Sequence, residues 1–203
     1  MTVSNGGNPN GASLSLDRRR QLLDVAEHYD LLIIEDDPYY FLQFESPVES
    51  IFTLDWEQGL GRTIRSDSLS KVISAGVRIG WLTGPNEVIE KVELATQAST
   101  LHCPALVQAI CAELLTAWGD DGFAAHVDSV QTFYKSQRDA MLKAAERHLT
   151  GLAEWECPQA GMFVWFKLNG IDDTQGLIEQ KAREANVLLV PGLIFKIILN
   201  KIK

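Results

Sequence analysis

The chain has 203 residues, of which 46% are hydrophobic and 22% charged, a composition typical of globular proteins. This length allows one large domain or two small ones with a proper core. The formal net charge of −9 argues against nucleic acid or an anionic membrane surface as the main partner. No uninterrupted apolar run reaches the length of a membrane span, and residues 1–5 lack the pattern of a signal peptide.

The cysteines and histidines carry no metal signal. Cys103, Cys111 and Cys157 are widely spaced and odd in number, which fits neither a disulfide framework nor a zinc site. We therefore expect buried free thiols. None of the four histidines has a metal-ligand spacing to a second histidine or a cysteine, so no metal site is predicted.

The first 40 residues are typical of an α/β protein, with a loop, a helix, a strand and a polar loop in succession. A dense turn signal over residues 5–11 precedes apolar positions at helical spacing from Leu16 to Tyr29. The apolar run 31–34 then leads into the acidic segment 35–38. This pattern predicts a strand buried on both faces of a parallel sheet, with a polar loop at its carboxyl end.

The later elements complete this domain and begin a second one. The second domain is expected to be smaller and α+β in character, joined to the first by a long amphipathic helix. In chain order we predict strands at 63–65 and 78–82, a helix from residue 85, a buried helix at 104–118, the long helix at about 122–149, strands at 155 and 161–167, a helix at 173–185 and a strand at 187–190.

Three polar clusters lie in loops beside predicted strands, where an open α/β sheet binds its ligands. They are Asn8-Pro9-Asn10-Gly11, Asp36-Asp37-Pro38-Tyr39, and Ser68-Leu69-Ser70-Lys71 with Arg78 seven residues later. Each cluster alone is a weak signal, because such turns are common and a lone lysine is usually a solvated surface charge. Their order and spacing together form the stronger signal.

In this order and spacing the clusters resemble those of the fold-type I, class I/II aminotransferases, which depend on pyridoxal 5'-phosphate (PLP). The resemblance runs from Asn5 to about Gly192, and it is closest to the 2-aminoadipate/kynurenine aminotransferase group. The residues that suggest this group are 33–44, Ser70-Lys71, 76–80, Trp155 and 161–163. The resemblance implies an α/β fold with two parts, both incomplete. Residues 1–121 would belong to the large cofactor-binding domain, a mostly parallel sheet with helices, and 122–203 to the small α+β C-terminal domain.

The resemblance implies catalytic roles for three residues. The lysine matching Lys71 forms an imine with the cofactor aldehyde, and its amine then moves the proton between the substrate α-carbon and the cofactor. Asp36, in preference to Asp37, pairs with the pyridine nitrogen and keeps the ring an electron sink. Tyr39 hydrogen-bonds the phenolic oxygen of the cofactor.

Four further residues are implied as cofactor ligands. Asn8 shares the phenolic oxygen with the tyrosine. Ser68 and Ser70 supply hydroxyl donors to the phosphate, and the guanidinium of Arg78 binds two phosphate oxygens at once.

Two departures from the family pattern bear on activity. A complete family member carries a long stretch before the Asn-Pro-x-Gly turn, so this chain reads as roughly the second half. After Pro191-Gly192 the family continues into an arginine for the substrate α-carboxylate, whereas the tail 193–203 has none. Lys196, Lys201 or Lys203 offers a charge there without a bidentate fork. We therefore expect weak cofactor binding at most and negligible turnover from the isolated chain.

Three functions are open at this point. The first is transfer of an amino group from 2-aminoadipate, kynurenine or a similar amino acid to a 2-oxo acid such as 2-oxoglutarate. The second is a truncated, non-catalytic fragment or isoform that associates with a full-length subunit. The third keeps the cofactor but changes the reaction to that of a lyase or decarboxylase. The resemblance also implies a homodimer, in either mitochondria or cytosol.

Overall fold

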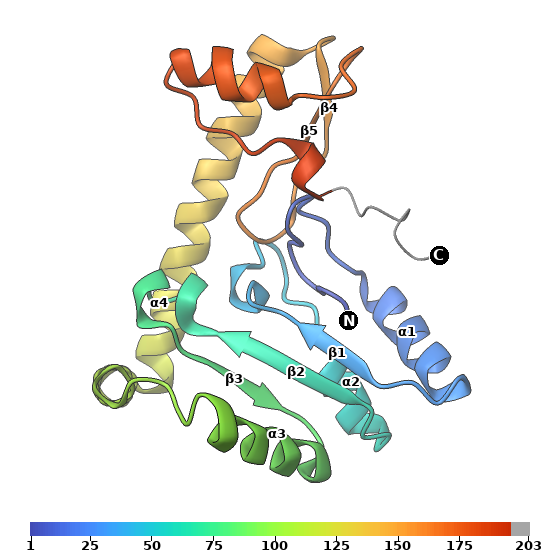
Figure 1. Cartoon of the computed structure of the whole chain (residues 1–203), viewed down its shortest axis with the longest axis vertical. Helices are drawn as coiled ribbons and strands as arrows, with labels where there is room; N and C mark the ends of the chain where they lie inside the picture. The colour runs from blue at the N-terminus through green and yellow to red at the C-terminus, as the bar shows by residue number, and fades with distance from the viewer. Residues whose placement is uncertain (196–203) are drawn as a thin grey trace.

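A three-stranded sheet in the order β1-β2-β3 lies at the centre of the fold, which the computed structural model describes for residues 1–195 (Figure 1). β1 (Ile33–Asp36) runs parallel to β2 (Thr63–Ser68), and β3 (Gly80–Thr83) runs antiparallel to β2. Thr2 adds a parallel bridge to Glu35 of β1. The predicted α/β class is confirmed. The strand predicted at 63–65 forms and extends to Ser68, whereas the strand predicted at 78–82 begins only at Gly80, because Arg78 has a left-handed backbone.

Two helices with serine caps form the core beside this sheet. α1 (Leu16–His28) begins where the Ser15 hydroxyl accepts from the Arg18 amide, and α2 (Ile51–Gln58) begins in the same way at Ser50. Such caps satisfy backbone N–H groups that have no partner within the helix. The core cluster is fully or almost fully buried and consists of Leu23, Ile51 and Leu54, with Leu14, Leu16 and Ile33 packed against it.

A network of buried polar side chains connects α1 with the carboxyl end of β1. Arg19 is fully buried and donates, over 2.7 to 3.3 Å, to the carbonyl oxygens of Leu14, Val48, Glu49 and Ser4 and the amide oxygen of Asn5. Asn5 in turn donates to Asp37 at 2.6 Å, and the Ser4 hydroxyl donates to Glu35 at 2.6 Å. These bonds fix residues 4 and 5 against the end of β1.

α3 (Asn86–Ser99) and α4 (Ala105–Leu149) follow the sheet. Gly119, with φ 58° and ψ −170°, breaks α4 into two arms. In Figure 1 the first arm is seen end-on in lime green, and the second, in yellow, runs up to β4 and β5. The helices predicted at 104–118 and 122–149 are therefore confirmed as the two arms of α4, but the prediction that the first arm is buried is wrong. Leu106 is 74% and Ile110 57% exposed, because no described residue packs over them.

The C-terminal part contains β4 (Ala153–Trp155) and β5 (Phe166–Leu168), which form an antiparallel pair. A helix follows with a π-helical stretch over Leu177–Ala182, and a short 3-10 helix covers Gly192–Phe195. The strand predicted at 187–190 is not formed, since no described strand lies beside it to share hydrogen bonds, and residues 161–165 are likewise irregular. The tail lysines at 196, 201 and 203 lie outside the described residues.

Two burial predictions need correction. Leu32 is 60% and Ile34 44% exposed, so β1 is not buried on both faces within the described chain, where no second layer covers those side chains. The three cysteines are free as predicted, but only Cys111 is buried and Cys157 is exposed. Among residues 1–195 no helix has both the length and the apolar character that crossing a membrane requires.

Candidate active site

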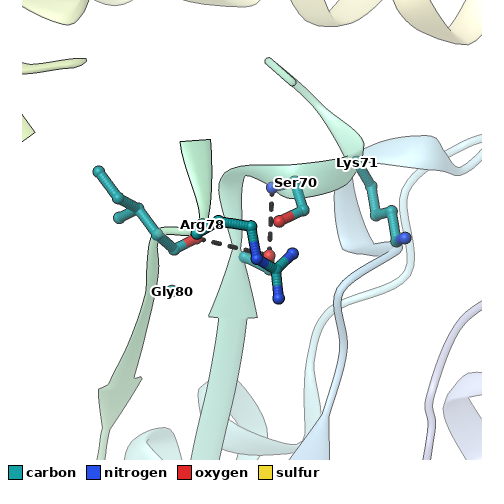
Figure 2. A pocket seen from close by; sticks show the side chains of 6 residues that line it. Ser70, Lys71, Arg78 and Gly80 are labelled. Carbon is teal, nitrogen blue, oxygen red and sulfur yellow. Dashed lines mark hydrogen bonds between the residues drawn. The ribbon is translucent and has the colours of Figure 1, made fainter. Parts of the chain in front are cut away.

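A shallow cavity of about 240 Å³ opens at the carboxyl end of β2. Its lining is made by six residues, Ser68, Ser70, Lys71, Arg78, Ile79 and Gly80 (Figure 2). None of these six carries a carboxylate, although the whole chain has a net charge of −9. Two hydroxyls beside two cationic side chains are the donor set that binds phosphate or carboxylate. The side chains of this cavity therefore have the chemistry that an anion requires.

The turn after β2 places the hydroxyls and the lysine. The Ser68 hydroxyl accepts from the Ser70 amide at 3.1 Å, and the Leu69 amide donates to the carbonyl of Ile79 at 3.0 Å. The first bond caps the 3-10 turn η2 (Leu69–Lys71), which the Val72 amide closes by donating to the carbonyl of Leu69, and the second joins the turn to the segment before β3. Leu69 and Val72 are 6% and 3% exposed and anchor the turn, so that the half-buried residues between them line the cavity.

The far wall of the cavity comes from the segment that enters β3. A Cβ at position 80 would lie 2.8 Å from the carbonyl oxygen of Asp67, so only glycine lets β3 approach β2 this closely. Arg78 has a left-handed backbone with φ 53°, which is unfavourable for an arginine and orients its side chain. Within the described chain its guanidinium has one contact, 3.5 Å to the Ala75 carbonyl. Figure 2 shows Lys71 and Arg78 extending from opposite sides of Ser70.

Asp36 and Asp37 occupy different surroundings. Asp36 accepts from the Ser66 hydroxyl at 2.8 Å, and Ser66 shares a face of β2 with Ser68 because alternate strand residues point the same way. Asp37 instead is buried against Asn5, and burial raises the pKa of its carboxyl from 3.8 to about 7. Asp36 therefore stays the predicted cofactor partner, while Asp37 belongs to the buried network that contains Asn5.

Tyr39 lies buried in the loop that follows β1. The centroid of its ring lies 5.7 Å from that of Phe163, in an edge-on arrangement. Burial is the main cause that raises the pKa of the Tyr39 hydroxyl, and the nearby negative charge of Asp36 raises it further. Asn8 is exposed in the turn over residues 8–10 and does not line the cavity. Gly11, at the end of this turn, approaches the residue that contacts Tyr39, because a Cβ on Gly11 would lie 2.8 Å from the carbonyl oxygen of Phe163.

The structure thus brings four of the seven predicted residues into one cavity, sets Asp36 and Tyr39 at the end of the adjacent strand, and leaves Asn8 apart. Sequence reasoning missed Ser66, although the alternation along β2 signals that it shares a face with Ser68. Gly80 belongs to the segment 76–80 that carries the family resemblance, and its expected role in backbone geometry is confirmed by the close approach to Asp67. In residues 1–195 no group of three His, Cys, Asp or Glu side chains is placed to hold a metal ion.

Comparison with known proteins identifies the family. The sequence model described as aminotransferase class I and II matches residues 1–201. The chain belongs to this family. Within the family it is 54% identical to the mitochondrial kynurenine/alpha-aminoadipate aminotransferase of Rattus norvegicus, over 96% of this chain and 45% of that protein. It is 36% identical to the aminotransferase tdiD of Emericella nidulans, over 96% of this chain and 46% of that protein.

Solved structures of family members share the fold. The α-aminoadipate aminotransferase of Thermus thermophilus, solved with N-(5'-phosphopyridoxyl)-L-leucine, matches with a TM-score of 0.88 and 34% identity, over 94% of this chain and 48% of that one. The kynurenine aminotransferase of Pyrococcus horikoshii matches with a TM-score of 0.84 and 36% identity, over 94% of this chain and 46% of that one. The chain therefore spans about half the length of the relatives it matches.

Proposed function

We propose that this chain carries the pyridoxal-phosphate-binding half of an aminotransferase, with Lys71 as the residue that holds the cofactor. The observation that carries the proposal is the cavity in which Lys71 lies beside two serine hydroxyls and Arg78, with no carboxylate in the lining. Family membership and the cofactor-related ligands named in the two solved structures support it.

The donors of the cavity fit a phosphate group. Arg78 offers a planar fork suited to two oxygens, and its one contact at 3.5 Å leaves most of its donors available. Ser70 adds a hydroxyl, and Ser68 orients the turn by accepting from the Ser70 amide. In this proposal the three side chains hold the phosphate at the carboxyl end of β2.

The remaining residues act around the ring. Pyridoxal phosphate supplies an electron sink for the carbanion formed at the substrate α-carbon. Asp36, held by Ser66, would accept a hydrogen bond from the pyridine nitrogen of the bound cofactor. Lys71 would hold the cofactor through Nζ, and its amine, once free, would move the proton at the substrate α-carbon. Tyr39 donates its hydroxyl to the phenolic oxygen, and Asn8 is proposed as the second donor to that oxygen.

The relatives support a substrate class. The rat protein is named for kynurenine and α-aminoadipate, so we propose one of these or a similar amino acid as amino donor and a 2-oxo acid such as 2-oxoglutarate as acceptor. We also propose the division into a large domain over 1–121 and a small domain over 122–203, and a homodimer in the complete enzyme. Of the two compartments expected, the mitochondrial names of the mammalian relatives favour the mitochondrion.

Titration of the purified chain with pyridoxal phosphate tests the proposal. Absorbance should show a complex that borohydride fixes covalently, and pyridoxal without the phosphate should bind far more weakly because it cannot use Ser70 and Arg78. The variant Lys71→Arg keeps the charge and should lose the covalent fixation. Absence of any complex, or equal binding of pyridoxal, would overturn the proposal.

A non-catalytic subunit is the second candidate, favoured by the exposed apolar side chains of Ile34 on β1 and of Leu32, which directly precedes the strand. Adding 2-aminoadipate or kynurenine to the loaded chain separates the two functions. Amino transfer to the cofactor identifies an aminotransferase. A cofactor complex that is not altered by either amino acid identifies the second candidate, and loss of carbon dioxide identifies a decarboxylase.

A further inference from the structure

The second arm of α4 holds both loops of the candidate site through its side chains. His126 Nε2 lies 2.8 Å from the carbonyl oxygen of Val72, and Gln131 Nε2 donates to the carbonyl oxygen of Phe41 at 2.9 Å. Because a carbonyl oxygen only accepts, the His126 ring carries a proton on Nε2 in this contact. The two bonds connect one helix to segments 54 and 90 residues away along the chain.

Each acceptor lies next to a residue of the proposed site. Val72 directly follows Lys71, is 3% exposed and ends the turn η2. Phe41 is the middle residue of the 3-10 turn η1 (Tyr40–Leu42), and Tyr39 directly precedes this turn. One bond therefore holds the turn that carries Lys71, and the other holds the turn that follows Tyr39.

The helix keeps these two attachments at a constant spacing. Five residues of α-helix separate them, which corresponds to about 7.5 Å along the axis. The ring of Trp118 stacks on His126 with 4.6 Å between centroids, and Phe123 meets Phe41 edge-on at 5.4 Å, so both attachments are supported by packing. A helix is stiff on this scale, whereas a three-residue turn alone is not.

We propose that His126 and Gln131 are positioning residues, which set the separation between Lys71 and Tyr39 through the backbone carbonyls that they bind. The inference rests on the proposed function, in which both of those residues act on one cofactor. Neither His126 nor Gln131 lines the cavity, so their effect reaches the ligand through the two turns. If either bond is lost, one of the two turns is no longer held, and the distance between Lys71 and Tyr39 is no longer fixed.

Near-isosteric variants isolate the two hydrogen bonds. His126→Phe keeps an aromatic ring against Trp118 and removes the donor, and Gln131→Met keeps the length of the side chain and removes the donor. His126→Gln restores an N–H donor and serves as the rescue variant. Gln137→Met and His148→Phe are matched controls, because both residues are exposed on the same arm of α4.

The test measures the rate at which the chain captures pyridoxal phosphate and, without cofactor, the hydrogen exchange of the Ile73 and Ser74 amides, which donate to Leu69 across η2. We expect each single variant to slow capture about fivefold, the effect of one lost hydrogen bond, and the controls to leave it unchanged. His126→Phe should also speed exchange at the two amides.

The double variant His126→Phe/Gln131→Met distinguishes positioning from packing. If the two bonds act by fixing the distance between Lys71 and Tyr39, losing the second bond adds little once the first is lost. The double variant should then capture the cofactor about as slowly as either single variant, whereas the decreases in unfolding temperature should add. Capture effects that multiply, or single variants that capture normally, overturn the inference. Failure of the unchanged chain to take up the cofactor overturns the proposed function first, and the positioning role with it.

Discussion

Replacing Asp37 with asparagine tests the electrostatics beside the candidate site. Asp37 is 1% exposed, receives one hydrogen bond from Asn5 at 2.6 Å, and has a second carboxylate oxygen without a partner in the described structure. Burial raises the pKa of this carboxyl from 3.8 to about 7, with the Asn5 bond acting in the opposite direction. An asparagine of nearly the same shape can still accept from Asn5 and carries no charge at any pH.

The sign of the effect follows from the direction of the pKa change. Because the pKa in the folded chain lies above that in the unfolded chain, the carboxyl contributes stability that is fully present below pH 3.8 and is lost as the pH rises through about 7. The difference between the two values corresponds to about 4 kcal/mol, at about 1.36 kcal/mol per pH unit. Asp37→Asn should therefore match the unchanged chain at acidic pH and exceed its stability by a few kcal/mol above neutral pH.

Urea unfolding followed by tryptophan fluorescence measures this difference, with the free energy of unfolding compared near pH 4, where little of this stability is lost, and near pH 8. Asp24→Asn on the exposed side of α1 is the matched control and should alter neither value by more than about 0.5 kcal/mol. Equal stability of Asp37→Asn and the unchanged chain near pH 8, or a loss at both pH values, would refute the assignment of a raised pKa to Asp37.

Three further substitutions have expected outcomes that can be checked directly. Gly80→Ala, whose Cβ would meet a carbonyl oxygen at 2.8 Å, should cost about 1–3 kcal/mol in urea unfolding and abolish cofactor capture, whereas Gly84→Ala, at 3.5 Å from its nearest neighbours, should be tolerated. Arg78→Lys keeps the charge but loses the fork, so the dissociation constant for pyridoxal phosphate measured by absorbance should rise about tenfold. Arg19→Met leaves the acceptors of a fully buried guanidinium unpaired and should lower stability by about 3–5 kcal/mol in a thermal melt, while Arg20→Met on the exposed side should be neutral.

The order of strands and helices could be predicted because it depends on local patterns. The helical spacing that begins at Leu16, the apolar run before Asp36 and the helical spacing of residues 122–149 are each patterns within a short stretch of the chain. Burial could not be predicted in the same way, because it depends on what covers a surface. Ile34 and Leu106 have the residue types of a core, yet both are exposed in the described structure.

In the candidate site, too, the local features could be predicted from the sequence and the long-range contacts could not. Ser68, Ser70 and Lys71 form one turn, so their spacing in the sequence already implies that they lie together. The bond from His126 to Val72 and the close approach of Gly80 to Asp67 join segments that are distant or on separate strands. The glycine at position 80 indicates a constraint on the backbone, but a single sequence does not show which atoms it meets, and it has no signal for the bond from His126. What holds the site in shape was therefore found only in three dimensions.

Mapping the site of covalent attachment tests the central claim most directly. The chain is saturated with pyridoxal phosphate, reduced with borohydride and digested, and the modified peptides are identified by mass spectrometry. The account predicts that the pyridoxyl group is found on Lys71 and that Lys71→Arg abolishes the modification at low cofactor concentration. Modification spread over exposed helical lysines such as Lys91 and Lys143, with Lys71 no more reactive than these, would contradict it.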